Sequence, residues 1–97
     1  MKTIDWNDLA LIDYHANINY LLREWSEKEA LNFIDDVESV LFELKSGKVE
    51  YKESNYENIR ECVVCKQITL YYRHLGKKQI ELLRFWNNYK DTKTLKL

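Results

Sequence analysis

The sequence contains no proline, no long apolar run and only two glycines, Gly47 and Gly76, and each scarcity excludes a class of protein. A phosphate-binding loop needs closely spaced glycines whose backbone amides can approach the phosphates, so these isolated glycines exclude one. A transmembrane helix needs about 18 consecutive apolar residues, and no such stretch occurs. No repeat, low-complexity tract or linker-like segment is present either. We therefore expect residues 1–97 to form a single small domain.

Cysteine and histidine are also scarce, which argues against a metal centre. Cys62 and Cys65 form an isolated C-x-x-C pattern inside a β-rich stretch. Residues three apart on a strand point to opposite faces, so this spacing should neither chelate one metal ion nor form a disulfide. The histidines, His15 and His74, lie far apart in the sequence and leave no cluster of zinc ligands. We expect no metal, no cofactor and reduced thiols.

The residues that are present indicate a packed cytoplasmic protein. Apolar residues make up 45% of the chain, which excludes the low hydrophobicity of disordered proteins. The N-terminal segment, MKTIDWNDLALID, carries acidic residues where a secretory signal peptide needs an apolar stretch. We therefore expect a cytoplasmic protein that does not associate with a membrane.

The net charge of −1 hides an uneven distribution along the chain. Residues 1–48 carry five Lys or Arg and ten Asp or Glu, a net charge of −5. Residues 62–97 carry eight Lys or Arg and two Asp or Glu, a net charge of +6. This asymmetry favours a basic face for an anionic partner. For Lys77 and Lys78 the plainer interpretation is a solvated turn.

The first half of the sequence predicts two amphipathic helices. Asn7 or Asp8 can cap the first helix, and Ser26 with Glu29 forms a capping box for the second. Gly47 is placed to end the second helix. The expected apolar stripes are Leu11, Tyr14, Ile18, Leu21, Leu22 and Trp25 in the first helix, and Ala30, Phe33, Ile34, Val37, Leu41 and Leu44 in the second. The short link requires an antiparallel hairpin, whose apolar face must be buried on a sheet.

The second half predicts an antiparallel meander of strands. The strands are expected at Ile59–Cys65, Gln67–His74 and Gln79–Trp86, because apolar and polar residues alternate and β-branched and aromatic residues are enriched. The links between these strands are so short that consecutive strands can pair only in antiparallel orientation. Met1–Trp6 is expected to pair with this meander. Residues 49–57 read as a polar connection.

The order and spacing of several motifs resemble those of the RelE/ParE family of toxins from bacterial toxin–antitoxin systems. The motifs are Asn58-Ile59-Arg60, Leu70-Tyr71-Tyr72-Arg73 and Leu82-Leu83-Arg84-Phe85-Trp86, preceded by the helical pattern that starts at Tyr20. The resemblance implies an α+β fold of order β-α-α-β-β-β, with a helical hairpin packed on one face of a small antiparallel sheet.

The resemblance also implies a function in growth inhibition. Such a toxin is neutralised by a cognate antitoxin and acts either on DNA gyrase or on mRNA during translation. It is a ribosome-dependent mRNA endoribonuclease if RelE-like, and a non-enzymatic gyrase inhibitor if ParE-like. The alternative is a degenerate, non-toxic binding module that has kept the fold.

Site residues follow from the resemblance and from the basic and aromatic residues in the second half. Cations neutralise phosphates, and aromatic rings stack on bases. The candidates for the effector surface, catalytic if the protein is an enzyme, are Arg60, Arg84, Tyr89 and Lys90. The candidates for nucleic-acid or partner binding are Lys66, Arg73, His74 and Trp86.

The sequence departs from the ribonuclease members of the family at important positions. Thr69 stands where they have an arginine on the sheet, and Tyr89 stands where many relatives have an arginine after the last strand. Lys90 can replace the charge but not the bidentate geometry of arginine. Arg84 has a structural alternative, an ion pair with a helix acid such as Asp13 or Glu24. These departures favour a gyrase inhibitor or a degenerate toxin.

Overall fold

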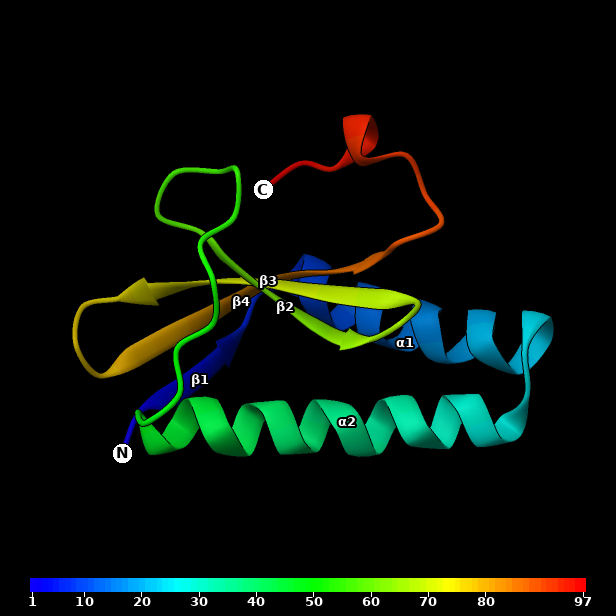
Figure 1. Cartoon of the computed structure of the whole chain (residues 1–97), viewed down its shortest axis with the longest axis horizontal. Coiled ribbons are helices and arrows are strands. Elements are labelled where there is room, and N and C mark those ends of the chain that lie inside the picture. The colour runs from blue at the N-terminus through cyan, green and yellow to red at the C-terminus, as the bar shows by residue number, and fades with distance from the viewer.

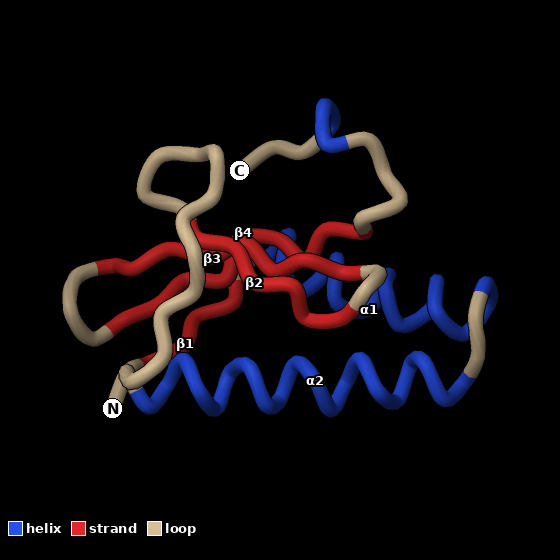
Figure 2. Tube along the Cα trace, viewed as in Figure 1, coloured by secondary structure: helices blue, strands red, loops and turns tan.

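The computed structural model describes residues 1–97 and shows two helices against one face of a four-stranded sheet (Figure 1). The elements along the chain are β1 (Thr3–Trp6), α1 (Asp8–Glu24), α2 (Glu27–Ser46), β2 (Arg60–Cys65), β3 (Ile68–Leu75), β4 (Gln79–Asn87) and the short 3-10 helix η1 (Thr92–Thr94). The opposite face of the sheet is flanked by the loop before β2 and by the C-terminal segment, both tan in Figure 2 apart from η1. The order β-α-α-β-β-β confirms the prediction.

The strand order in the sheet is β1-β4-β3-β2. Strands β2, β3 and β4 form the expected antiparallel meander. β1 joins it in parallel with β4, with Thr3 opposite Gln79 and Trp6 opposite Leu82, so the sheet as a whole is mixed. A parallel partner is possible here because two helices connect β1 to the meander and can cross the sheet.

The helix ends follow the capping residues read from the sequence. Asn7 Oδ1 accepts a hydrogen bond from Ala10 N at 2.8 Å, and Ser26 Oγ accepts one from Glu29 N at 3.1 Å. Gly47 ends α2 in the left-handed conformation, with φ of 73°. The Glu29 carboxylate accepts a bond from Gln67 Nε2 at 3.3 Å and so ties the start of α2 to the β2–β3 turn.

The main core lies between the helices and the sheet. Phe33, Leu21, Tyr72, Leu82 and Phe85 are almost completely buried in it. Burial of such side chains contributes roughly 1.5–3 kcal/mol each and holds the helical layer on the sheet. No helix combines the length and apolarity needed to cross a membrane.

The predicted apolar stripe was correct for most of α2 but partly wrong for α1. Leu11, Leu22 and Trp25 are 47%, 49% and 39% exposed, whereas Asn17 is buried. The reason is that α1 contacts the edge of β4 with polar side chains, which rotates the helix away from the orientation expected from hydrophobicity alone.

Polar side chains of α1 satisfy the free edge of β4. β1 pairs with β4 only as far as Leu82, so the following residues have no neighbouring strand on that side. Phe85 N donates to Asp13 Oδ2 at 3.1 Å, and Asn17 Nδ2 donates to Phe85 O at 2.8 Å. Because an unpaired buried backbone group is costly, these contacts explain why polar residues face inward on α1.

The core assignment predicts different effects for the phenylalanines of α2. Phe33→Ala should lower the free energy of unfolding by about 3–5 kcal/mol, because it removes a fully buried ring and leaves a cavity. Phe42, which is 75% exposed on the same helix, is the matched control, and Phe42→Ala should change the free energy by less than about 0.5 kcal/mol. Urea denaturation measures both. Equal effects would contradict the assigned faces.

Candidate functional site

The sheet face opposite the helices carries a small apolar cluster. Tyr71, Leu83 and Trp86 pack there with Leu95, which comes from the C-terminal segment that crosses this face (Figure 1). Leu95 is buried although its neighbours in the segment are exposed. The segment therefore covers part of the surface on which the sequence placed the effector residues.

The indole ring of Trp86 packs against two of the predicted cations, Arg84 and Lys90. Its ring centroid lies 5.3 Å from Arg84 Cζ and 5.8 Å from Lys90 Nζ, within the range of cation–π attraction. The side chain is buried, and its indole Nε1 has no hydrogen-bond partner. Trp86 therefore positions these cations, and its ring is not open for stacking with a base.

Arg84 is bound to a helix acid. Its Nε lies 2.6 Å from Asp13 Oδ2 and its Nη2 lies 3.0 Å from Asp13 Oδ1, so the pair is bidentate. The hydrogen bonds and the charge of Asp13 raise the pKa of Arg84 above its ordinary value, against the opposing effect of burial. This confirms the structural alternative with Asp13, whereas Glu24 lies beside Arg23 at 3.4 Å.

A second set of candidates meets at the β2–β3 turn. Lys66 Nζ lies 4.5 Å from the centroid of the Trp25 ring, which in turn lies 6.1 Å from the ring of Tyr89. Tyr89 is 63% exposed, and Lys66 and Lys90 are exposed and form no salt bridge. We call Trp25, Lys66 and Tyr89, together with Lys90, which follows Tyr89 in the chain and approaches Trp86, the basic–aromatic surface. Trp25 was missed because the sequence assigned it to the core.

Thr69 helps to fix this surface. Thr69 Oγ1 donates to Asn88 Oδ1 at 2.7 Å, and Asn88 Nδ2 donates to Lys66 O at 3.0 Å. Asn88 N also donates to Gln67 O at 2.7 Å. Thr69 therefore holds the start of the C-terminal segment against the β2–β3 turn.

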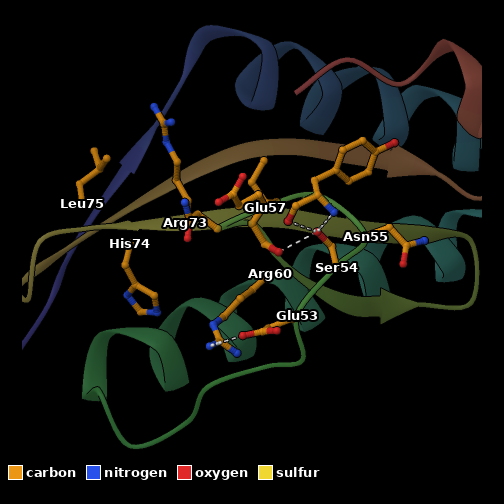
Figure 3. Close-up of a pocket in the computed structure, with 11 residues that line it drawn as sticks. Glu53, Ser54, Asn55, Glu57, Arg60, Arg73, His74 and Leu75 are labelled. Atoms are coloured by element: carbon orange, nitrogen blue, oxygen red, sulfur yellow. Dashed lines mark hydrogen bonds and ion pairs between the residues drawn. The ribbon is translucent and has the colours of Figure 1, made fainter.

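The remaining candidates lie at the other end of the sheet, in an open groove of about 740 Å³ (Figure 3). Arg60, Arg73 and His74 line it, together with residues 53–59 of the loop before β2. Each arginine has an acidic partner. Arg60 Nε lies 3.3 Å from Glu50 Oε1, and Arg73 Nε lies 2.7 Å from Glu81 Oε1.

His74 shares the acidic partner of Arg60. Its Nε2 lies 2.8 Å from Glu50 Oε1, at an angle that does not make a hydrogen bond, and its Nδ1 lies 3.5 Å from Lys2 Nζ. Arg60 also donates to Tyr51 O at 2.6 Å. These pairings could not be predicted from the sequence, because Glu50 belongs to a loop whose path depends on contacts with distant residues.

The eight predicted residues therefore do not form a single site. β3 separates Lys66 at its start from His74 near its end, and Tyr89 lies on the side of Lys66 because Asn87 is opposite Ile68. General acid–base cleavage of RNA needs a base and phosphate-binding cations within reach of the same few atoms. The basic–aromatic surface has free cations without a histidine. In the groove His74 lies near arginines that are neutralised by acids, and the one cation without an acid beside it is Lys2.

The cysteines lie on one face of β2, which corrects the expectation from their spacing. The register shifts between Val63 and Cys65, so that Cys62 and Cys65 lie opposite Leu70 and Ile68 and both pack on the helix side of the sheet. Both thiols are free. Burial raises the pKa of Cys62 to about 11, which makes it a poor nucleophile at neutral pH.

Two solved structures resemble this fold over most of its length. A structure of the chromosomal ParDE toxin–antitoxin system from P. aeruginosa matches with a TM-score of 0.72 and 19% identity, covering 90% of this chain and 96% of that one. A copper-bound mutant toxin from Helicobacter pylori matches with a TM-score of 0.63 and 15% identity, covering 91% and 96%. No protein-family model and no curated protein sequence matches the chain. The chain therefore has the fold of RelE/ParE-like toxins, as the sequence resemblance implied.

The pair between Arg84 and Asp13 should be important for stability. Asp13→Ala should lower the free energy of unfolding by about 3–5 kcal/mol, because it leaves the half-buried Arg84 and the amide of Phe85 without their partner. Arg23→Ala removes an exposed pair with Glu24 and should cost less than about 1 kcal/mol. Urea denaturation of both variants is the measurement, and similar small losses would refute this role.

The raised pKa of Cys62 predicts loss of stability in alkaline solution. The fold favours the neutral thiol, so this stabilisation is complete below the ordinary thiol pKa of about 8.5. It is lost as the pH rises towards the folded value of about 11. Between these pH values the free energy of unfolding should fall more steeply for the unsubstituted protein than for Cys62→Val, which contains the same tyrosines. If chemical denaturation gave the same pH dependence for the unsubstituted protein and for Cys62→Val, the Cys62 thiol would not be the cause of the loss of stability.

Proposed function

We propose that this chain is the toxin of a type II toxin–antitoxin pair. The observation that carries the proposal is the fold, which matches a structure of the ParDE toxin–antitoxin system over 90% of this chain. The second match is itself described as a toxin. The basic–aromatic surface, with exposed cations and an exposed tyrosine, supplies a surface for a macromolecular target.

The geometry favours inhibition by binding over cleavage of RNA, and DNA gyrase is the target that the family resemblance offers for such a toxin. Arg60, Arg73 and Arg84 are each held by an acid, and His74 lies away from the free cations of the basic–aromatic surface. An inhibitor that acts by binding needs no general base. Exposed tyrosine and lysine side chains on a fixed backbone are sufficient to form its binding surface.

The groove supports cleavage of mRNA as a second candidate function. Arg60 and His74 lie on the same side of β3 and border a space that an RNA strand could enter, whereas Arg73 points to the other side of the strand (Figure 3). The carboxylates of Glu50 and Glu53 lie 3.3 Å and 3.7 Å from the guanidinium of Arg60. A phosphate would have to displace both of them to bind this arginine. This competition makes cleavage the weaker candidate.

The partner expected for such a toxin is a small antitoxin with a segment that wraps the toxin and covers its basic surface. The helices offer further contacts, because they expose large apolar side chains that the fold does not use. These are Leu9, Leu11, Ile12, Leu22, Leu31 and Phe42. Exposed apolar groups in this number are typical of a surface that is covered by a partner.

Induced expression in a bacterium tests the function and the target together. Growth, mRNA integrity and plasmid supercoiling are followed after induction. Growth arrest with altered supercoiling and intact mRNA supports the gyrase inhibitor, and arrest with cleaved mRNA supports the ribonuclease. Undisturbed growth at a high level of soluble protein would favour the non-toxic binding module.

The basic–aromatic surface should be needed for growth arrest. If Lys66 and Lys90 contribute about 1 kcal/mol each to target binding, their joint replacement by alanine weakens it about 30-fold. We expect the double variant to restore growth at an unchanged level of soluble protein, because both side chains are exposed. The control is Lys28→Ala with Lys52→Ala, which removes the same charge elsewhere on the surface. Full toxicity of the Lys66 and Lys90 variant would place the effector surface elsewhere.

A further inference from the structure

Five lysines from three distant segments meet at the end of the molecule that holds the N-terminus, the last turn of α2 and the β3–β4 turn (Figure 1). We call this group, Lys2, Lys45, Lys48, Lys77 and Lys78, the lysine tip. Backbone hydrogen bonds hold it together: Lys2 N donates to Lys45 O at 2.9 Å, and Thr3 N donates to Lys78 O at 2.7 Å. The sequence explained Lys77 and Lys78 as a solvated turn, but it could not show what lies beside them.

The lysine tip has no acidic partners. None of its lysines forms a salt bridge, although the chain as a whole carries slightly more acidic than basic residues. The acids nearest in sequence have other contacts. Asp5 accepts a hydrogen bond from Gln79, and Glu43 accepts one from Tyr51. Glu50 lies beside Arg60 and His74, and Glu81 is paired with Arg73. The tip is therefore a local concentration of positive charge on a protein with a net charge of −1.

The surface around the lysines indicates the kind of partner. A shallow hollow of about 580 Å³ lies beside the turn and is lined by Thr3, Leu75, Lys77, Lys78 and Gln79, of which only Leu75 is apolar. A protein segment usually needs an aromatic or aliphatic anchor in a pocket, and single-stranded nucleic acid needs an aromatic ring for stacking. Compact ammonium groups on flexible stems suit phosphate groups along a backbone.

We propose that the lysine tip binds the phosphate backbone of a nucleic-acid duplex without reading its sequence. The site lies at the opposite end of β3 and β4 from the basic–aromatic surface. Binding here can therefore orient the protein on a target that contains nucleic acid while the other end stays free. The proposal does not depend on toxicity, because binding is measured on the isolated chain.

The test uses fluorescence anisotropy with labelled DNA and RNA duplexes of about 20 base pairs, over a salt series that starts near 50 mM. The test variant is Lys48→Gln, Lys77→Gln and Lys78→Gln combined, because all three residues are exposed and their side chains form no salt bridge. The control combines Lys28→Gln, Lys52→Gln and Lys93→Gln, which are also exposed and change the net charge equally.

We expect the unsubstituted protein to bind, with log Kd depending linearly on log salt concentration. The test variant should reduce that slope by about 0.9 for each lysine that contacts a phosphate, and the control should leave it nearly unchanged. A preference for DNA or for RNA would identify the source of the backbone, and equal binding supports the shared chemistry. No binding at the lowest salt, or equal losses in both variants, would overturn the proposal. Binding of poly-glutamate with the same dependence on Lys48, Lys77 and Lys78 would instead identify an acidic protein as the partner.

Discussion

Phe85 is the residue at which the helical layer and the sheet are joined by specific hydrogen bonds. Its amide donates to Asp13 and its carbonyl accepts from Asn17, so two side chains of α1 replace a missing neighbouring strand. The same carboxylate of Asp13 binds Arg84. Asp13 thereby fixes the rotation of α1 and also removes one arginine from the surface. Much of the arrangement of the candidate site depends on this contact.

Acidic residues decide which cations are available to a partner. Arg60, Arg73 and Arg84 are each neutralised within the fold, whereas the lysines at both ends of the sheet have no acidic partner. Arginine is suited to buried and bidentate pairs, and lysine to exposed contacts. Arg60, Arg73 and Arg84 are therefore occupied by pairs within the fold, whereas the lysines at the ends of the sheet are left without acidic partners, which the total charge of the chain does not reveal.

The elements were predictable because their signals are local. Asn7, Ser26 and Gly47 mark the helix ends through contacts within one turn, and alternation with short links marks the meander. The face of the sheet to which each strand residue points was harder to predict, because it depends on the register between neighbouring strands. The irregular pairing after Val63 moved Cys65 to the core side. The separation of His74 from Tyr89 follows from the pairing of β3 with β4, and the acidic partners of Arg60 come from a loop. The sequence could therefore predict candidate residues for the site but not how they are arranged in space.

The parallel pairing of β1 with β4 joins two segments that are far apart in the sequence, and this has a consequence for folding in the cell. Thr3 pairs with Gln79, so β1 has no partner strand until the ribosome has also synthesised β4. At a synthesis rate of about 5–20 residues per second, β1 waits for several seconds. Contacts of such high sequence separation also slow folding itself. The two helices can form before residues 79–87 have been made, but the sheet cannot be completed until β4 is available, which delays any activity of the newly made protein.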